Sequence, residues 1–438
     1  MYNEEGDNMS KFNISRKYRI YPNDDQIKII ENTFSCCRFV WNKLLEKASE
    51  SYFDPEETFH IVNYGDIVLE YEFLQDKSLK IDRHAISNEK MFLKKAFKRF
   101  FDNKGSIIKY RKDGKPKGFP HYKSKKNSKC SYTNNNIKYH YKHPIIDYEN
   151  HLINLPVIGL TKFNKREKPV PSHWNECNVT ISKSHNKYYV SICFEYEDDT
   201  PGINSDIDEF KIYNPNRNIS ILGLDYASKC LYVDSNGESA LYPRYYRHSQ
   251  KRLRMLNKQL SRRQKGGKNY EKTKLKISKL YDHIANQRKD FLHKLSTSIT
   301  KMYDVICVEN IDMQSIARGL RLAKSTYDNA FGMFREMLMY KQKRIPYHLL
   351  VYANRYYPSS KLCSKCYHKN DNLTLADRVY ICPKCGNIIQ RDHNAALNLR
   401  NDALRMLNEN IVSEMNFKLL TETTLGVSLL SDEVTHLG

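Results

Sequence analysis

Four cysteines in the C-terminal third of the chain are spaced as ligands of a single metal ion. They form two Cys-x-x-Cys pairs, Cys363 with Cys366 and Cys382 with Cys385, separated by 15 residues. Zinc in structural sites prefers four thiolates, and a two-residue spacer lets both sulfurs of a pair lie on one side of a tight turn. Sulfur at all four positions leaves no coordination site for a substrate water. The pattern therefore predicts one structural Zn²⁺ ion held in a zinc ribbon.

Three carboxylates stand where predicted strands end or a predicted helix begins. Asp225 follows the apolar run 219–224, Glu309 ends a second apolar run, and Asp392 lies at the start of a helical pattern. Taken singly, each is more often a turn residue or a helix cap than a catalyst. Taken together, they offer the hard oxygen ligands that Mg²⁺ requires. Two such ions roughly 4 Å apart can activate water and stabilise the leaving oxygen in phosphodiester hydrolysis. We therefore predict that the three carboxylates are catalytic and bind two Mg²⁺ ions.

The order of the predicted elements explains how these carboxylates can meet. Strands are expected at 219–224, at 230–233 and near 240–242, then two helices, a strand at 304–309, a helix at 328–344 and a strand at 349–352. Three hairpin strands followed by helices and further strands is the order of an RNase H-like α/β core. In such a sheet the strands that end in Asp225 and Glu309 are neighbours. A helix that begins near Asp392 can pack across the same edge.

The net charge of +22 is concentrated in two windows of the chain. Residues 94–126 hold 13 Lys and Arg against two Asp, and residues 251–279 hold 12 against one Glu. Charge gathered in this way indicates a polyanion partner, although a solvated helix face or a disordered basic loop is the alternative. A membrane surface is a poorer partner because neither window carries a strong apolar anchor. The candidate nucleic-acid-binding residues are Lys94, Lys95, Lys98, Arg99, Arg111, Lys112, Lys123, Lys125, Arg262, Arg263, Lys265 and Lys268. Aromatic residues interleave with the first window, where stacking on bases and ordinary core packing are both open.

The N-terminal half predicts a β domain that is interrupted by helices. Residues 17–22 read as a strand, residues 24–103 carry two helical patterns, and residues 104–200 look β-rich. The clearest element is a hairpin whose turn runs from Ser184 to Lys187. Residues 201–218 are expected to be a linker, and the tail 408–438 has no clear pattern.

Composition excludes two locations for the protein. No stretch approaches the ~20 apolar residues of a membrane span. The first ten residues are polar and acidic, unlike a secretory signal. We therefore expect a protein that is not secreted, nuclear in a eukaryotic or viral setting and cytoplasmic in a bacterial one. Eleven cysteines in such a chain favour metal binding over disulfides.

These motifs, in this order, resemble the TnpB family of transposon-encoded RNA-guided nucleases and its eukaryotic and viral relatives called Fanzor, which are related to type V CRISPR effectors. Gly223-Leu224-Asp225 resembles the family's first RuvC motif, Val308-Glu309-Asn310 the second, and the run from Arg391 to Asn398 the third. The run from Pro358 to Cys366 is similar to the entry into the family's zinc ribbon. The match spans roughly residues 17–407. The chain departs from the family's motifs at Tyr226-Ala227 and at Ile389-Gln390. Neither departure removes one of the three candidate catalytic carboxylates.

The resemblance implies a fold and an activity beyond what the residues alone predict. It implies a multidomain α/β protein with a RuvC-like nuclease domain, a split β-barrel-like wedge domain and a helical recognition domain. The expected boundaries are 11–23 and 104–200 for the wedge, 24–103 for the recognition domain, 219–355 and 391–407 for the nuclease, and 356–390 for the zinc ribbon. It also implies a guide RNA transcribed from the end of the transposon that encodes the protein, and recognition of a short DNA motif beside the target. A single RuvC site would cleave both strands of double-stranded DNA. The protein is expected to be monomeric with its RNA.

Two other functions remain open from the sequence. An RNA-guided DNA-binding regulator that does not cleave would keep the basic windows and the ribbon but lose a carboxylate, and all three carboxylates are present. A guide-free RuvC-like nuclease or transposase would not need both basic windows or so large an N-terminal half.

Overall fold

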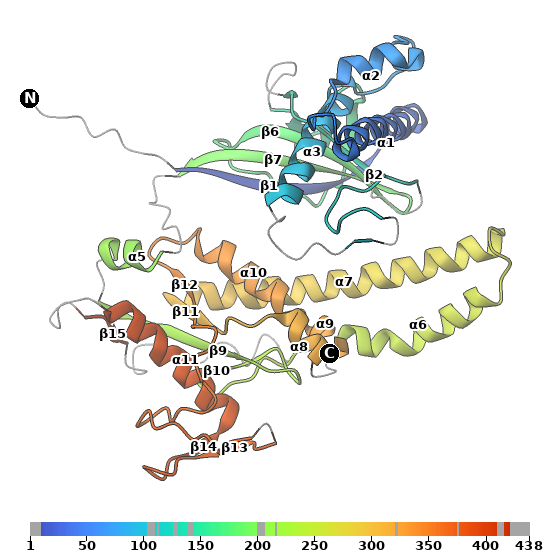
Figure 1. Ribbon diagram of the computed structural model, residues 1–438. Helices are drawn as coiled ribbons and strands as arrows, with labels where there is room; N and C mark the ends of the chain where they lie inside the picture. The colour runs from blue at the N-terminus through green and yellow to red at the C-terminus, as the bar shows by residue number, and fades with distance from the viewer. Residues whose placement is uncertain are drawn as a thin grey trace, which may run out of the picture. The chain divides into compact units, whose positions relative to one another are not determined.

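The chain folds into two compact units, residues 1–199 and residues 200–438 (Figure 1). The computed structural model describes residues 10–102, 110–111, 114–125, 130–137, 144–198, 206–214, 217–319, 323–374, 376–409 and 416–420. No helix in these ranges is both long enough and apolar enough to cross a membrane.

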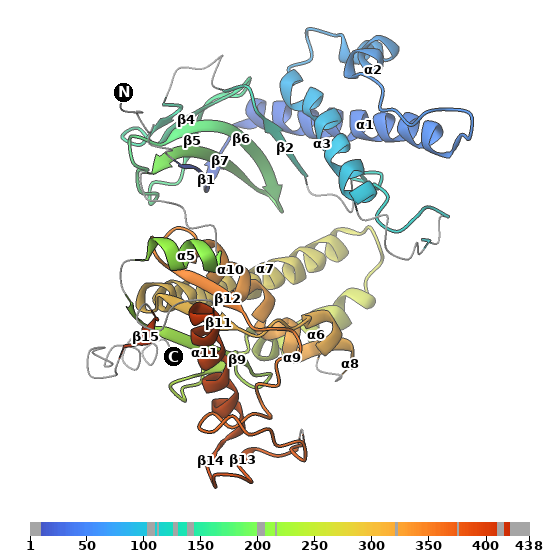
Figure 2. The same cartoon turned by 60° about the vertical axis from the view of Figure 1, so that its left-hand side comes forward.

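The first unit is built on an antiparallel sheet whose strands come partly before and partly after the helices in the chain. Among the described residues it has seven strands in the order β2-β6-β7-β1-β5-β4-β3 (Figure 2). The strands are β1 (Ser10–Tyr21), β2 (Cys130–Asn134), β3 (Ile146–Asp147), β4 (Leu152–Leu155), β5 (Gly159–Phe163), β6 (Asn175–Ser184) and β7 (Lys187–Asp198). Strand β1 lies between β7 and β5, which confirms that the opening strand belongs to the same sheet as the β-rich segment.

The predicted hairpin is present as β6 and β7, with Ser184 paired with Lys187 across a two-residue turn. His185 adopts a positive φ of 57° there, as a tight turn of this kind requires. Alternate residues of the two strands are buried, which fixes which face of the sheet packs on the core. No pairing among the described residues joins the edge strands β2 and β3, so the sheet is not seen to close as a barrel.

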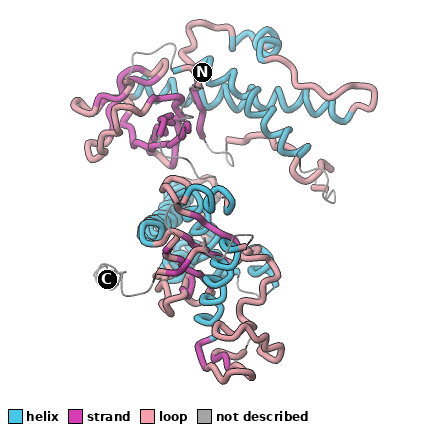
Figure 3. The backbone as a smooth tube through the Cα atoms, turned by 90° about the vertical axis from the view of Figure 1, so that its left-hand side faces the viewer, coloured by secondary structure: helices cyan, strands magenta, loops and turns pink. Residues whose placement is uncertain are grey.

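Helices inserted between β1 and β2 share one core with this sheet. They are α1 (Asp24–Phe53), α2 (Tyr64–Glu70), the short 3₁₀ helix η1 (Glu72–Leu74) and α3 (Arg83–Asp102). Helix α1 starts at Asn23, whose side chain accepts a hydrogen bond from the Gln26 N–H while the Gln26 side chain accepts one from the Asn23 N–H. This capping box satisfies two N–H groups that the helix cannot pair internally. The helical character predicted for 24–103 is confirmed, and Figure 3 shows the helices and strands of this unit gathered at opposite ends.

The second unit contains the mixed sheet that was expected to position the carboxylates. In the described part of the chain its order is β10-β9-β11-β12, with β9 antiparallel to β10 and parallel to β11, and β11 parallel to β12. The bounds are β9 (Ile221–Tyr226), β10 (Tyr232–Asp234), β11 (Val305–Val308) and β12 (Leu349–Tyr352). The third hairpin strand expected near 240–242 is reduced to a bridge between Val233 and Ser239. With that bridge, the order is the one expected of an RNase H-like core.

Helices cover both faces of this sheet, because successive side chains of each strand point to opposite sides. One face packs on α7 (Lys268–Met302) and α10 (Phe331–Gln342) through Leu222, Leu224, Ile306 and Val308. The other face packs on α5 (Ile207–Tyr213) and α11 (Arg391–Asn408) through Ile221, Val305 and Cys307. The remaining elements are α6 (Tyr245–Ser261), α8 (Met313–Gly319), α9 (Ala323–Asn329), β8 (Asn218–Ile219), β13 (Val379–Ile381), β14 (Ile388–Gln390) and β15 (Lys418–Leu419).

Three expectations about the second unit need correction. Part of the supposed linker is helix α5, because Phe210 is fully buried and packs against Phe417. Part of the tail is ordered too, since β15 pairs in parallel with β8. The helix predicted over 328–344 is split into α9 and α10, because Ala330 adopts a left-handed conformation with φ 54° and begins a new helix.

Candidate active site and metal centre

Asp225 and Glu309 meet at one edge of the mixed sheet β10-β9-β11-β12. The parallel register pairs Leu224 of β9 with Val308 of β11, so the next residue of each strand reaches the same edge. The two carboxyl groups share a hydrogen bond, and the Tyr226 N–H donates to the Glu309 carboxylate. The neighbouring placement expected from the strand order is therefore present in the structure.

Burial dominates the electrostatics of this pair. Asp225 is only 8% exposed, and burial is the main cause that raises its pKa well above the ordinary carboxyl value. The negative charges of Glu309 and Asp392 raise it further. Burial also raises the pKa of Glu309, and its hydrogen bonds with Asp225 and Ser359 oppose that shift. Two adjacent carboxylates that are hard to ionise together provide the kind of site that a divalent cation stabilises, because the cation takes the place of the shared proton.

Asp392 lies in the first turn of α11 and does not cap it. The cap is Gln390, whose side chain accepts a hydrogen bond from the His393 N–H. This observation removes the alternative explanation that Asp392 is only a helix cap. The Asp392 carboxylate pairs with the Arg391 guanidinium at 3.0 Å, and its charge acts on both Asp225 and Glu309. In the described residues the three carboxylates do not form as tight a ligand group as the cysteines do.

The backbone and carboxylate of Glu309 are held by two side chains that had no predicted role, Arg335 and Ser359. The Arg335 guanidinium of α10 donates from Nη1 to the carbonyl oxygens of Glu309, at 3.2 Å, and Ile311, at 3.0 Å. The Ser359 hydroxyl donates to Glu309 Oε1 at 3.2 Å. Arg335 carried no signal in the sequence beyond its place in a helix. Ser359 was part of a recognised motif, but nothing in its spacing pointed to Glu309.

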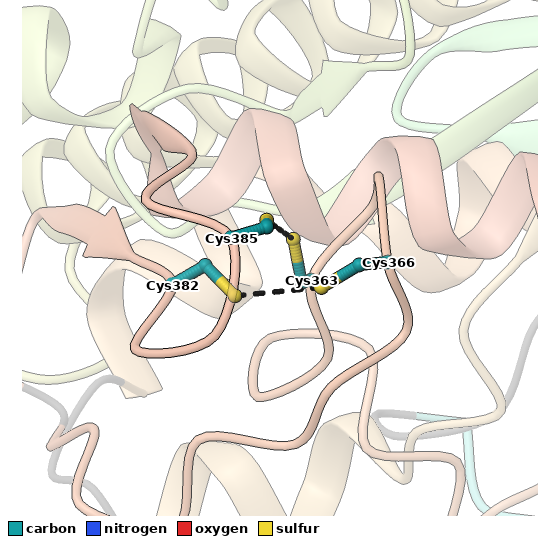
Figure 4. Close-up of side chains that lie close together, drawn as sticks. All are labelled: Cys363, Cys366, Cys382 and Cys385. Atoms are coloured by element: carbon teal, nitrogen blue, oxygen red, sulfur yellow. Dashed lines mark hydrogen bonds between the residues drawn. The ribbon is translucent and has the colours of Figure 1, made fainter.

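The four cysteines form a cluster whose sulfur atoms all lie within 4.8 Å of one another (Figure 4). Cys363 Sγ lies 3.7 Å from Cys385 Sγ, and Cys366 Sγ lies 3.5 Å from Cys382 Sγ. Four thiolates around one zinc at ~2.3 Å place neighbouring sulfurs about 3.8 Å apart in a regular tetrahedron. The cluster therefore has the donor set and the size of a Cys₄ zinc site.

Backbone geometry around the cysteines also fits metal binding. The N–H groups of Lys384 and Cys385 donate to the Cys382 thiolate, and the His368 N–H donates to the Cys366 thiolate. The residue after each second cysteine has a positive φ, 70° at Gly386 and 57° at Tyr367. Glycine adopts this conformation at little cost, whereas Tyr367 is strained, as residues at ligand sites often are.

The first basic window is divided between the surface and the interior. Lys94, Lys95, Lys98 and Arg99 are exposed on α3, and Lys125 is exposed beyond it. Lys123 instead pairs with the buried Glu89 carboxylate at 2.5 Å and lies 4.1 Å from the Trp41 ring centroid. The Arg111 guanidinium donates to the Phe119 carbonyl oxygen at 3.1 Å. Lys112 lies outside the described residues. Lys123 therefore has an internal partner that the charge count did not reveal.

Aromatic residues of the same window are mostly core. Phe97, Phe100 and Phe119 are buried, and the Phe119 ring contacts those of Phe97 and Phe100 at centroid distances of 5.3 and 5.4 Å. Tyr110 and Tyr122 remain exposed. Of the two explanations left open by the sequence, core packing holds for the phenylalanines.

The second basic window lies in the arm formed by helices α6 and α7 (Figure 1). The two helices pack against each other through Leu253, Leu256 and Leu280. Arg262, Lys265 and Lys268 are exposed around its tip. Arg263 is also exposed, but its guanidinium donates to the Asn269 carbonyl oxygen at 2.6 Å and to the Thr273 hydroxyl. Arg263 therefore helps to hold the tip together.

Family models match three separate parts of the chain. Residues 191–319 match the OrfB_IS605 model, described as "Probable transposase", and residues 331–399 match the Cas12f1-like TNB domain. These two ranges contain all three carboxylates and all four cysteines. Residues 9–53 match a model described as a helix-turn-helix domain, although the structure has strand β1 and one continuous helix α1 there.

Two relatives are similar to the chain over most of its length. A Streptomyces pristinaespiralis protein named "Putative RNA-guided DNA endonuclease" is 27% identical over 386 residues, which is 87% of each chain. The Escherichia coli K12 protein named "Putative RNA-guided DNA endonuclease InsQ" is 26% identical, covering 87% of this chain and 90% of its own. Among solved structures, a Cas12f1-sgRNA-target DNA complex matches with a TM-score of 0.49 and 14% identity, covering 90% of this chain and 99% of that one.

Proposed function

We propose that the chain is a member of the TnpB family and acts as an RNA-guided DNA endonuclease, which cuts double-stranded DNA beside a short flanking motif. The observation that carries the proposal is the shared hydrogen bond of Asp225 and Glu309 at the edge of a buried mixed sheet. Burying two adjacent carboxyl groups is electrostatically costly, and this cost is not expected for a purely structural pair. A bound divalent cation would compensate the cost, so the pair supports a metal-binding site.

In this proposal the catalytic ligands are Asp225, Glu309 and Asp392, and the cofactor is a pair of Mg²⁺ ions. When bound there, such ions would supply an activated water and a stabilised leaving oxygen for phosphodiester hydrolysis. The chain's own residues orient the ligands. The Tyr226 N–H donates to the Glu309 carboxylate, Arg335 holds the Glu309 backbone, and Arg391 orients the Asp392 carboxylate.

The Cys₄ cluster is proposed to hold one structural Zn²⁺ ion. Its four positions are all sulfur, so it offers no open position for catalysis. We assign residues 356–390 to this zinc ribbon, and 219–355 with 391–407 to the nuclease domain. In the first unit, we assign the sheet to a wedge domain of barrel type. We assign residues 24–103 to a recognition domain.

The basic surfaces are proposed to bind phosphates of a guide RNA and of the target DNA. The exposed cations on α3 and on the tip of the α6–α7 arm suit backbone contacts, which give affinity without reading sequence. Base pairing by a guide RNA from the element's own end would then supply specificity. We propose that the protein works as a monomer with its RNA, in the nucleus or the cytoplasm according to its host.

The proposal is tested by separating cleavage from binding. In the purified protein–RNA complex, Asp225→Ala, Glu309→Ala and Asp392→Ala should each lower the rate of DNA cleavage by at least a hundredfold and leave DNA binding within about threefold. The cleavage should require Mg²⁺ or Mn²⁺ and stop with chelator. Near wild-type cleavage by Glu309→Ala would refute the assigned site, and a wild-type complex that binds guided targets without cutting would favour the non-cleaving regulator.

A further inference from the structure

The segment 358–364 connects the zinc ribbon to the carboxylate pair. Ser359 is 5% exposed, and its hydroxyl donates to Glu309 Oε1 at 3.2 Å. Four residues later the same segment supplies Cys363, one of the four cysteines of the cluster. The Leu362 N–H donates to the Pro358 carbonyl oxygen at 3.1 Å, so the residues between Ser359 and Cys363 form a closed turn.

Two asparagines of α11 anchor this segment. Asn398 Nδ2 donates to the carbonyl oxygens of Ser359, at 2.7 Å, and Leu362, at 2.8 Å. Asn394 Nδ2 donates to the Leu362 carbonyl oxygen at 2.6 Å, and Asn394 Oδ1 accepts from the Ser364 N–H at 3.0 Å. Both asparagines are fully buried, and residues four apart lie on the same face of a helix.

A buried amide N–H that is left unpaired is costly, so the pairing of both Nδ2 groups with backbone carbonyls strongly favours one position for the segment. Helix α11 also carries Asp392 in its first turn. The same helix therefore sets Asp392 directly and sets Glu309 through the anchored Ser359.

We propose that Ser359, held in place by the zinc-ribbon entry segment, is a positioning residue that orients the Glu309 carboxylate for its divalent metal ion. The proposal rests on the proposed function in one respect, namely that Glu309 is a metal ligand. A hydroxyl bonded to one carboxylate oxygen fixes the rotation of the group and leaves the remaining lone pairs directed at the cation. Side chains that orient metal ligands in this way typically contribute about 10–100-fold to metal affinity or activity.

The experiment measures Mn²⁺ binding by calorimetry on the full-length, zinc-loaded protein, together with the Mn²⁺ dependence of cleavage by its RNA complex. The variants are Ser359→Ala, Ser359→Thr, Glu309→Gln and Ser360→Ala. The last is the matched control, because it removes the same atom from the neighbouring serine. Zinc content and melting temperature are recorded for every variant.

Ser359→Ala should weaken Mn²⁺ affinity about tenfold and raise the Mn²⁺ concentration needed for half-maximal cleavage by a similar factor. Saturating Mn²⁺ should restore its cleavage rate to within about threefold of wild type, which a general packing defect would not allow. Ser359→Thr, which keeps the hydroxyl, should restore the affinity, and Ser360→Ala should match wild type.

Two patterns of failure are distinguishable. If Glu309→Gln loses Mn²⁺ affinity while Ser359→Ala keeps it, the positioning role is overturned and the proposed function stands. If Glu309→Gln itself binds Mn²⁺ as wild type does, Glu309 is not a ligand and both proposals fall. Should Ser359→Ala lose its zinc or fail to fold, Ser359→Thr decides: wild-type affinity supports the role, and a tenfold loss with intact zinc opposes it.

Discussion

Gly223 of β9 lies directly against the backbone of Ala396 in α11, so closely that a Cβ atom added at Gly223 would overlap the Ala396 carbonyl oxygen. The same atom would lie 2.7 Å from the backbone nitrogen of Arg400. Asp225 follows Gly223 by two residues, and Asp392 precedes Ala396 by about one helical turn. The close approach of strand and helix therefore sets the separation of the two carboxylates.

Adding a methyl group at Gly223 should damage the site without touching a carboxylate. Because neither backbone can yield without moving α11, we expect Gly223→Ala to destabilise the second unit by about 1–3 kcal/mol. Cleavage should fall at least tenfold. Thermal melting and cleavage assays check both. Gly65→Ala is the control, since nothing lies within 4 Å of its Cβ position, and equal behaviour of the two variants would contradict the packing argument.

The raised pKa of Asp225 predicts an unusual effect of pH on the metal-free protein. A carboxyl group whose pKa is raised on folding contributes stability that is complete below its unfolded pKa of about 3.9 and is lost as pH rises through the folded value. In chelator near neutral pH, Asp225→Asn should therefore melt a few degrees above wild type. The difference should shrink as the pH falls toward 4. If Asp225→Asn melted below wild type at every pH, ionisation of Asp225 beside Glu309 would not be destabilising the folded protein.

Loss of one thiolate should release zinc and loosen the ribbon. We expect about one zinc per chain in the wild-type protein by elemental analysis, and less than a tenth of that in Cys382→Ser, with a lower melting temperature. Cys130→Ser, which changes a half-buried cysteine outside the cluster, should keep its zinc. Wild-type protein that is free of zinc after purification without chelator would refute the assignment.

The tip of the α6–α7 arm allows phosphate contacts to be separated from structure. Reversing Arg262, Lys265 and Lys268 together should weaken RNA and DNA binding and make its salt dependence shallower, by up to about 0.9 in log–log slope for each lost contact. The melting temperature should stay near wild type. Arg263→Glu should lower the melting temperature instead, because it breaks the bonds to Asn269 and Thr273. The measurement is a set of binding titrations at 50–200 mM salt. If the binding constant of the triple variant depended on salt as steeply as that of wild type, these three residues would not contact phosphates.

The elements that a local pattern determines could be predicted from the sequence. The β6–β7 hairpin follows from alternation and a two-residue turn, and the cysteine cluster follows from the spacing of its pairs. The proximity of Asp225 and Glu309 also followed, because parallel neighbouring strands bring their next residues to one edge.

Features that depend on contacts between distant residues were missed. Phe210 makes α5 part of the core because Phe417 packs on it, and no local pattern predicts that contact between distant residues. The break at Ala330 is a tertiary override of good helix propensity. Lys123 appeared to be a surface cation because its partner, Glu89, lies 34 residues earlier in the chain. The bond from Ser359 to Glu309 spans 50 residues.

RNA guidance is tested by asking whether the sequence of the bound RNA determines where the DNA is cut. The protein is purified with its RNA, the guide segment is replaced, and the cuts on double-stranded DNA that carries both target sequences are mapped. If RNA guides the protein, the cuts should move to the sequence matching the new guide and disappear after RNase treatment, while the Asp225→Ala complex binds the same target without cutting it. Cuts that stay in place after the guide is changed, or that persist undiminished after RNase treatment, would contradict it and leave a guide-free nuclease.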